Sequence, residues 1–287
     1  MDEQSFSLAL ASIIADRKSG ASELARRCLD VMVKSAYEAP ATNAVELIAQ
    51  LEQRAAKLAA ARPSMTPIVR LLEQWQTNAV LDPGTELAVL RKQAATAAVE
   101  LIDVSHQAVK ACAQQAAQYI GPNQTLFTHS LSSTVMEVFH LLREQGVSAI
   151  ITESRPLYEG YILARQLSEW QIPTTLITDA QIGLFINQAD AVLVGADSLL
   201  ADGSLINKAG TYPLALAAHD QCVPFYVCCE SFKCRTDVMG SPELETMDAS
   251  ELQAPSLPGV KSQNVYFDIT PARLISVWFG ENKKHAT

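Results

Sequence analysis

Apolar residues recur every three or four positions along the first part of the chain, from residue 4 to about residue 118. Stretches such as "ELIAQLEQRAAKLAAARPS" and "ELAVLRKQAATAAVELIDVSHQAVKACAQQAAQYI" keep this spacing and are rich in Ala, Leu, Glu, Gln and Arg. Because one face of an α-helix repeats every 3.6 residues, the spacing predicts amphipathic helices. Turn-forming residues interrupt the pattern at Pro40, at Arg62-Pro63 and at Asp82-Pro83-Gly84. Residues 1–118 are therefore predicted to form an N-terminal α-helical domain.

After Gly121-Pro122 the pattern changes, and short apolar runs alternate with amphipathic segments of helical length. The runs that read as strands are "TLFTH", "VSAIITE", "TTLIT", "AVLVGAD", "PFYVCCE" and "NVYFD", and "PARLISVWF" follows the last of them. Strands that alternate with helices of this size predict an α/β domain over residues 119–287, with a mostly parallel sheet and helices on both faces. The tract from Ser241 to Gln263 contains Pro and Gly and is predicted to be a loop.

Polar residues follow each predicted strand at its carboxyl end. In chain order they are His129, Ser130, Glu153, Ser154, Arg155, Asp179, Asp197, Glu230 and Lys233. Asp and Ser are also favoured helix caps, so none of these residues alone indicates a site. The carboxyl ends of parallel strands lie on one edge of a sheet, where such folds bind their ligands. Their joint placement therefore indicates a cleft.

Cations gather in this predicted cleft, although the protein as a whole is acidic. Arg155, Lys208 and Lys233 are expected to converge with Asp197, and Asn207-Lys208 comes immediately before a predicted helix. Helix N-termini near Ser132 and Thr211 would add backbone N–H donors for an anion. This chemistry suits a phosphorylated small molecule. Neither a GxxxxGK[ST] loop nor a GxGxxG turn is present, so NAD is not expected.

The overall composition narrows the class of protein. The net charge is −9, which argues against a nucleic-acid-binding surface. No window approaches the roughly 18 consecutive apolar residues of a membrane span, and the acidic N-terminus lacks the order of a signal peptide, so we expect a cytoplasmic protein. The adjacent Cys228 and Cys229 should point to opposite faces of a strand, and no cysteine pair has zinc-ligand spacing. Structural thiols are expected, with no metal and no cofactor.

The ordered motifs "THSLSS", "ITESRPLYEG", "ITDAQIG", "VLVGADSLLADGSLINKAGT", "PFYVCCESFK" and "VYFDITP" resemble those of a known family. It contains the alpha, beta and delta regulatory subunits of translation initiation factor 2B, the ribose-1,5-bisphosphate isomerases and the methylthioribose-1-phosphate isomerases. The resemblance covers about residues 120 to 280. It extends more weakly into "SGASELARR" and "ARPSMTPIVR" of the helical part.

The resemblance implies a helical domain followed by a Rossmann-like domain, assembled as homodimers or larger homo-oligomers. It implies a cleft between the domains that binds a phosphorylated pentose in the isomerases. The family's catalytic Asp matches Asp197, and its Asn-Lys pair matches Asn207 and Lys208. By the same matching, the remaining candidates for substrate or phosphate binding are Gly20, Ala21, Arg62, Ser64, Arg155 and Lys233.

One departure leaves two hypotheses open. The bisphosphate isomerases carry a catalytic Cys where this chain has Ser130, whereas "GADS" around Asp197 is the isomerase form. A serine hydroxyl is a much weaker acid than a thiol and needs a neighbouring base, and His129 should face away from it. The chain is therefore either a pentose-phosphate aldose–ketose isomerase or a non-catalytic regulatory protein that binds a sugar phosphate or nucleotide. In the isomerase Asp197 and Ser130 are the catalytic candidates: Asp197 would move the proton between adjacent carbons, and Ser130 would at most form hydrogen bonds.

Overall fold

The computed structural model describes residues 1–17, 19–62, 65–235, 244–282 and 284–286. The chain divides into two compact units, Met1–Gln107 and Ala108–Thr287. The long helix α5 (Leu87–Ile120) runs through this division and through the predicted boundary after residue 118. Each unit is described by itself below.

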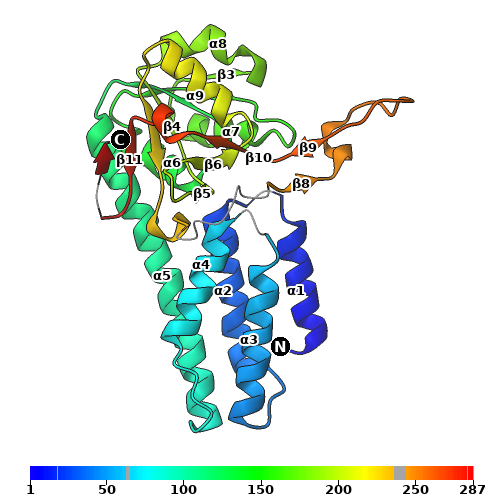
Figure 1. Cartoon of the computed structure of the whole chain (residues 1–287). Helices are drawn as coiled ribbons and strands as arrows, with labels where there is room; N and C mark the ends of the chain where they lie inside the picture. Colours follow the sequence, from blue (N-terminus) through cyan, green and yellow to red (C-terminus); the bar gives the residue numbers. More distant parts are fainter. Residues whose placement is uncertain (18, 63–64, 236–243, 283, 287) are drawn as a thin grey trace. The chain divides into compact units, whose positions relative to one another are not determined.

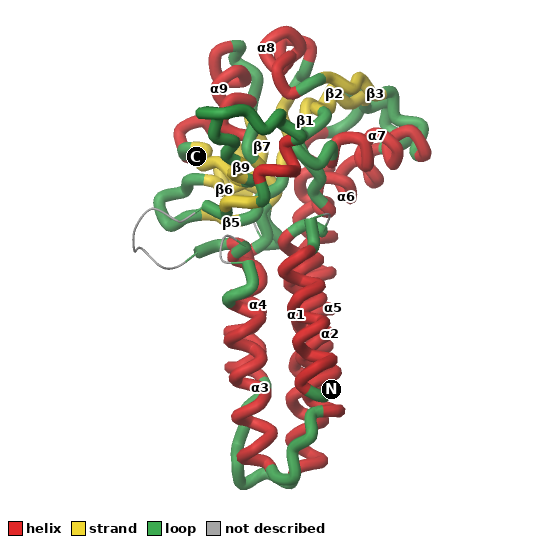
Figure 2. The backbone as a smooth tube through the Cα atoms, turned by 90° about the vertical axis from the view of Figure 1, so that its right-hand side faces the viewer, coloured by secondary structure: helices red, strands yellow, loops and turns green. Residues whose placement is uncertain are grey.

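The first unit is a bundle of helices, as its apolar periodicity predicts. Besides the first part of α5, its helices are α1 (Glu3–Ala15), α2 (Ala21–Glu38), α3 (Ala44–Ala59) and α4 (Thr66–Asn78). They run alongside one another in both views (Figures 1 and 2). The three interruptions at prolines fall between α2 and α3, between α3 and α4, and between α4 and α5. An additional break between α1 and α2 lacks a proline and was not expected.

Side-chain caps explain where two of these helices begin. Asp2 accepts a hydrogen bond from the backbone N–H of Ser5 (2.8 Å) at the start of α1, and Asn43 accepts one from Glu46 (2.9 Å) at the start of α3. Glu46 reaches back to the N–H of Thr42 (2.9 Å), so the first turn of α3 is satisfied from both directions. The amphipathic spacing thus sets the buried faces, and the caps set the helix starts.

The second unit is built on one mainly parallel sheet. Within the described residues its strand order is β12-β11-β7-β4-β1-β2-β3, and only β12 is antiparallel to its neighbour. The strands are β1 (Thr125–Thr128), β2 (Ser148–Thr152), β3 (Thr174–Ile177), β4 (Ala191–Val194), β7 (Phe225–Cys228), β11 (Val277–Phe279) and β12 (Lys284–Ala286). From β1 the chain runs outward to β3 and then returns to place β4 on the other side of β1. The carboxyl ends of β1 and β4 therefore form the topological switch point, where such sheets bind ligands.

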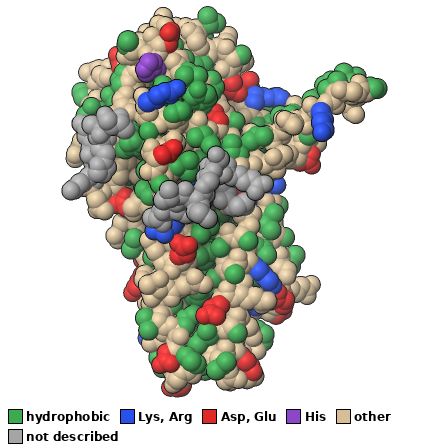
Figure 3. Space-filling view, in the orientation of Figure 1, with side chains coloured by type: hydrophobic (Ala, Val, Ile, Leu, Met, Phe, Trp, Pro, Cys, Tyr) green, Lys and Arg blue, Asp and Glu red, His purple; other side chains and the backbone are tan. Residues whose placement is uncertain are grey.

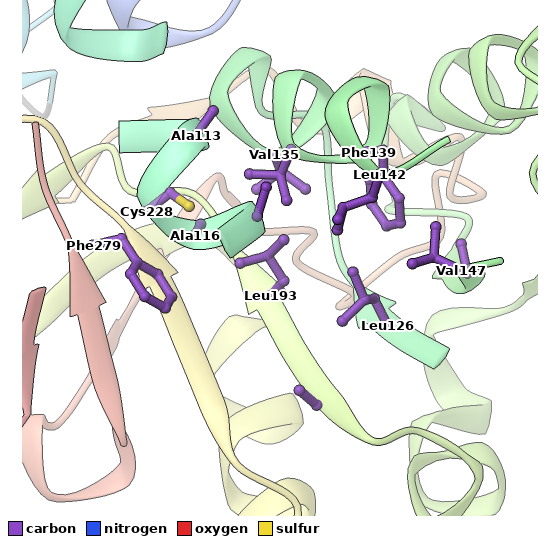
Figure 4. Close-up of a cluster of buried hydrophobic side chains, with 14 of the residues drawn as sticks. Ala113, Ala116, Leu126, Val135, Phe139, Leu142, Val147, Leu193, Cys228 and Phe279 are labelled. Carbon is purple, nitrogen blue, oxygen red and sulfur yellow. The ribbon is translucent and has the colours of Figure 1, made fainter. Parts of the chain in front are cut away.

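Helices cover both faces of this sheet, as predicted. One core packs α6 (Ser133–Leu142), α7 (Glu159–Glu169) and the end of α5 against one face, with Leu126, Leu193 and Phe279 pointing into it (Figure 4). The other core packs α8 (Ile182–Phe185) and α9 (Thr211–Asp220) against the opposite face, with Phe127 and Val192 pointing into it. Neighbouring residues of one strand enter different cores, which is the period-2 alternation of a strand covered on both sides.

The end of the chain corrects the predicted strand arrangement. "NVYFD" is not a strand of the parallel sheet: β10 (Phe267–Thr270) pairs antiparallel with β6 (Leu205–Lys208), which pairs with β5 (Ser198–Leu199). The last parallel strand is β11, inside "PARLISVWF", which was not among the predicted strands. The predicted loop from residue 241 contains β8 (Thr246–Met247), paired with β9 (Asn264–Val265), and a 3₁₀ turn at Ala249–Leu252; residues 241–243 lie outside the described residues.

Two further expectations can be followed in the structure. Cys228 packs in the core with α6, whereas Cys229 packs in the core with α9, so the adjacent thiols do face opposite sides of the sheet. On the face shown in Figure 3, cationic and anionic side chains lie scattered among uncharged ones and form no continuous basic field. Among the described residues, no helix has the length and apolarity that a membrane crossing needs.

Candidate functional site

The loops that carry Ser130 and Asp197 meet at the switch point of the sheet. Ser130 follows β1, Asp197 follows β4, and these two strands pair in parallel. A Cβ atom on Gly195 would lie 2.3 Å from the Oγ of Ser132, so the two loops approach each other more closely than any other residue would allow. The sequence prediction that these two residues share one edge of the sheet therefore holds.

The hydroxyl of Ser130 has an acidic partner that the sequence did not reveal. Ser130 adopts a left-handed backbone conformation (φ 67°), and its N–H donates to the Oγ of Ser154 (2.8 Å). This conformation directs its Oγ to Oε2 of Glu159, to which it donates a hydrogen bond of 2.5 Å. Ser130 is partly exposed, whereas Glu159 is only 9% exposed. The carboxylate thus lies behind the hydroxyl.

Glu159 is the first residue of α7, and a close backbone approach turns it inward. A Cβ atom on Gly160 would lie 1.8 Å from the carbonyl oxygen of Thr152, so only glycine lets α7 begin directly against the end of β2. Tyr158 precedes the helix in a left-handed conformation. The other carboxylate oxygen of Glu159, Oε1, lies 2.8 Å from Nζ of Lys208. Ser130 after β1 and Lys208 at the end of β6 therefore meet at the carboxylate that follows β2.

His129 is not the base for Ser130, as the strand alternation predicts. It is 3% exposed, and both ring nitrogens have partners: Nε2 lies 3.0 Å from the carbonyl oxygen of Ala209, and Nδ1 lies 2.6 Å from Oγ1 of Thr152. A carbonyl oxygen only accepts, so Nε2 carries the proton and Nδ1 accepts from Thr152. Burial lowers the pKa of His129, against the opposing effect of Asp179, which favours the neutral ring. The imidazole of His129 therefore links the loop after β1 to the end of β2 and to the turn before α9.

On the β7 side of the switch point, Lys233 belongs to a second buried carboxylate group. Nζ of Lys233 lies 2.7 Å from Oε2 of Glu230, and the hydroxyl of Thr134 donates to Oε1 of the same carboxylate. Burial alone would lower the pKa of Lys233, but Glu230, with Cys229 and Asp197, outweighs this and raises it to about 12. Lys233 therefore stays cationic and adds positive potential near Asp197.

Asn207 and Lys208 lie shortly before helix α9, as expected, but on a strand that the sequence did not predict. This strand, β6, belongs to the small antiparallel sheet. The amide of Asn207 donates to Oγ1 of Thr211 (3.0 Å). Nζ of Lys208 lies 4.1 Å from the centre of the Tyr266 ring. Lys208 is 6% exposed. The ammonium group of Lys208 is thus held between the carboxylate of Glu159, which also binds Ser130, and the ring of Tyr266.

The anion site predicted at the N-terminus of α9 is occupied by a side chain of the protein, Asp268. The N-terminus of α9 was expected to offer its N–H groups to a ligand, but Oδ2 of Asp268 accepts from the N–H groups of Gly210 (2.7 Å) and Tyr212 (3.0 Å). The expectation failed because the strand pairing opposite Asn207, which brings Asp268 there, has no sequence signature. At the other predicted N-terminus, Ser132 caps α6 through its own side chain.

Arg155 is also engaged within its own loop region. Its N–H donates to Oδ2 of Asp179 (2.8 Å), and Oδ1 accepts from Ser154 (2.9 Å), which fixes the turn after β2. The guanidinium group donates to the hydroxyl of Tyr158 and to the carbonyl oxygen of Leu252 (2.8 Å). Its role as a phosphate ligand stays a prediction, since binding would exchange these contacts for a ligand.

The candidates in the helical unit lie near the start of α2. Gly20 is its N-cap and Ala21 its first residue. Arg62 is buried and donates to the carbonyl oxygen of Asp16 (3.0 Å), in the turn that leads into α2. Ser64 lies outside the described residues. Arg62 is therefore tied to the turn before α2.

The sequence pattern of the Initiation factor 2 subunit family matches residues 17–282. The chain belongs to this family. A Pyrococcus horikoshii protein named eIF-2B subunit 2-like is 35% identical over 263 residues, which cover 91% of this chain and 88% of that protein. The ribose 1,5-bisphosphate isomerase of Archaeoglobus fulgidus is 32% identical over 264 residues, covering 90% of this chain and 82% of the isomerase.

Solved structures of the family share this fold. The Pyrococcus horikoshii translation initiation factor eIF-2B superposes with a TM-score of 0.86 at 30% identity, covering 99% of this chain and 97% of that one. The 5-methylthioribose 1-phosphate isomerase of the same organism gives a TM-score of 0.82 at 19% identity, with 98% and 84% covered. The family recognised from the motifs and the predicted fold class are both confirmed. The family includes isomerases and initiation-factor subunits, so membership alone does not decide between the two hypotheses.

Proposed function

We propose that this chain is an aldose–ketose isomerase acting on a phosphorylated pentose, with ribose 1,5-bisphosphate as its first candidate substrate. The observation that carries the proposal is the meeting of Ser130 and Asp197 at the switch point, next to the buried cations Lys208 and Lys233. Asp197 and the hydroxyl–carboxylate pair of Ser130 and Glu159 come from loops at the ends of neighbouring parallel strands, where this class of sheet binds ligands. The relationship to an isomerase over most of both chains supports it.

The reaction needs one acid and one base. Phosphate on the anomeric oxygen prevents ordinary ring opening. As C2 loses its proton, the C2–H electron pair forms the C1–C2 double bond, the bond from C1 to the ring oxygen breaks, and that oxygen gains a proton. The C2 hydroxyl of this enol then loses its proton, and C1 gains one, which gives the 2-ketose. Asp197 suits the transfers at the oxygens, and the Ser130 side suits those at carbon. Lys208 and Lys233 would neutralise phosphate charge.

The decisive experiment is incubation with ribose 1,5-bisphosphate in D₂O. The proposal expects ribulose 1,5-bisphosphate, detected by NMR, with deuterium at C1 to the extent that the proton taken from C2 exchanges with solvent before it is returned. Asp197→Asn should reduce kcat by roughly 10²–10⁴-fold with little change in KM, because it removes a proton donor and keeps the volume. Lys208→Ala should raise KM instead. Unchanged substrate without label would reject the isomerase reading for this sugar.

A regulatory role is the second candidate, and the similarity to an eIF-2B subunit 2-like protein favours it. In that case the cluster would bind a sugar phosphate or nucleotide without turnover. Binding without chemistry would appear as thermal stabilisation, about 2.7 kcal/mol at a hundred times Kd, with no deuterium incorporation. A cytoplasmic location and assembly into homodimers or larger homo-oligomers are part of both proposals, and size-exclusion chromatography with light scattering tests the latter.

A further inference from the structure

The hydroxyl of Ser130 cannot serve as a base without a group that takes its proton. An unperturbed thiol titrates at about 8.5, so a small fraction is ionised at neutral pH, whereas a serine hydroxyl is not ionised there. The isomerase proposed above therefore lacks a proton acceptor if Ser130 acts alone. The structure supplies one directly behind it, since the Oγ of Ser130 donates to Oε2 of Glu159 at 2.5 Å.

The environment of Glu159 fits a proton acceptor. Its Oε1 lies 2.8 Å from Nζ of Lys208, so a cation neutralises the carboxylate while Oε2 keeps its bond to Ser130. Glu159 also begins α7, an eleven-residue helix whose N-terminal dipole favours a negative charge. A glutamate carboxylate is the base for a carbon-bound proton in the isomerisation of a triose phosphate, so Glu159 has the chemical group that this step needs.

We propose that Ser130 and Glu159 form a two-residue proton relay. The Oγ of Ser130 takes the proton from C2 of the substrate as its own proton passes to Oε2 of Glu159, while the C–H electron pair forms the enol double bond. In the second half of the reaction Glu159 returns its proton through Ser130 to C1. No oxidant or further reactant is needed, and the relay begins and ends with an ionised carboxylate and a neutral hydroxyl.

The exposure of the two residues sets the order of the relay. Ser130 is partly exposed and Glu159 is 9% exposed, so a substrate meets the hydroxyl first. The backbone fixes that order, because the N–H of Ser130 is bonded to Ser154 and the start of α7 is packed against β2. His129 offers no competing route, since both its ring nitrogens are bonded to other groups, the hydroxyl of Thr152 and the carbonyl oxygen of Ala209. Glu159 is therefore a positioning and proton-accepting residue that acts through Ser130.

The inference rests on the proposed isomerase activity, and kinetics of Glu159→Gln test it. We expect kcat for ribose 1,5-bisphosphate to fall roughly 10²–10⁴-fold, with KM unchanged or lower because Lys208 becomes free for phosphate. Ser130→Ala should cause a similar loss, and the double variant no more than the larger single one, since the two residues act as one unit. Glu169→Gln makes the same chemical change at the exposed far end of α7 and should leave kcat unchanged.

A thiol at position 130 distinguishes a proton relay from a purely structural role of Glu159. Ser130→Cys in the Glu159→Gln background supplies its own ionisable group, so we expect at least about tenfold recovery of kcat over Glu159→Gln, with a pH profile displaced to the alkaline side, toward the roughly 8.5 of a thiol. A structural defect would not be repaired by this change. If Glu159→Gln does not fold, Ser130→Ala and Ser130→Cys in the wild-type background still measure the contribution of the hydroxyl.

The outcomes distinguish this inference from the function on which it rests. Active wild-type protein with kcat of Glu159→Gln within about threefold, or with additive losses in the double variant, would overturn the relay and leave the isomerase intact. Wild-type protein that shows no turnover of ribose 1,5-bisphosphate would overturn both. A loss in Glu159→Gln that the thiol repairs, together with the alkaline shift, is the result expected.

Discussion

Two glutamates of the α/β unit are each bonded to one lysine and one hydroxyl, but their surroundings differ. Glu230 joins Lys233 and Thr134, and Glu159 joins Lys208 and Ser130. Glu230 and Thr134 are 0% exposed, whereas Ser130 is partly exposed. We call the first set the sealed trio and the second the open trio.

The two trios are also assembled differently. In the sealed trio Glu230 and Lys233 are three residues apart in one short turn, so the pair forms locally. The members of the open trio follow β1, follow β2 and end β6, so it exists only when three loops are in place. A buried charge pair without solvent access holds geometry and potential, whereas a pair with an exposed hydroxyl can also exchange protons with a ligand. We therefore expect the sealed trio to stabilise the fold and the open trio to take part in proton transfer with a ligand.

The largest expected difference between the trios is in stability. Glu230→Ala leaves Lys233 buried without its partner, and we expect the free energy of unfolding to fall by about 3–5 kcal/mol. Glu159→Ala should cost less, about 2 kcal/mol, because water reaches the open trio and Lys208 keeps its contact with the Tyr266 ring. Urea denaturation of both variants measures this difference. Equal losses would remove the distinction between sealed and open.

Asp268 is a third carboxylate of the α/β unit, and its carboxylate is bonded to backbone N–H groups where the two glutamates are bonded to a lysine. Burial raises its pKa from 3.8 to about 6, although hydrogen bonds from Tyr212, Gly210 and Thr211 act to lower it. In the described part of the chain its Oδ1 has no hydrogen-bond partner. The folded pKa lies above the unfolded one, so the native state holds this proton more tightly, and its contribution to stability is lost as the pH rises through about 6.

Asp268→Asn removes this titration while keeping an oxygen for the N–H groups of α9. The stability of wild type relative to the variant should therefore decrease by about 2.4 kcal/mol between about pH 4 and pH 7, from a shift of roughly two pKa units. Denaturation of both proteins at the two pH values measures it. A difference that does not change with pH would mean that the carboxylate is better stabilised than its surroundings indicate.

Much of the fold follows from the sequence because long, regular patterns are reliable. The helices of the first unit and strands β1 to β4 and β7 were predicted from spacing, and the strand-end rule placed Ser130 and Asp197 at one edge. Strand β6 was missed because "LINK" is four residues beside a turn. Strand β11 was missed because "PARLISVWF" has helical spacing and its strand is only three residues long. Segments this short carry too few periods to decide between helix and strand.

The site residues that were missed share another cause. Glu159 reads in the sequence as an ordinary charge at a helix start, and its inward direction depends on the approach of Gly160 to the carbonyl of Thr152. Asp268 reads as a strand residue, and its bond to the start of α9 depends on the register with Asn207. Both positions are set by contacts between distant segments. Local patterns contain no information about such contacts, so a single sequence does not predict them.

The smallest expected difference concerns the two hydroxyls. Thr134→Val keeps the shape of the side chain but leaves Oε1 of Glu230 without its donor in a site sealed from water, so we expect a loss of about 1–3 kcal/mol. Ser130→Ala removes the matching donor from Glu159, but water can replace it there, and the loss should stay below about 1 kcal/mol. Thermal unfolding of the two variants at equal concentration measures the contrast. Ser130→Ala is expected to abolish most turnover and to change stability little. Thr134→Val is expected to lower stability and to leave most turnover. The two variants together therefore test whether Ser130 serves the reaction or the fold.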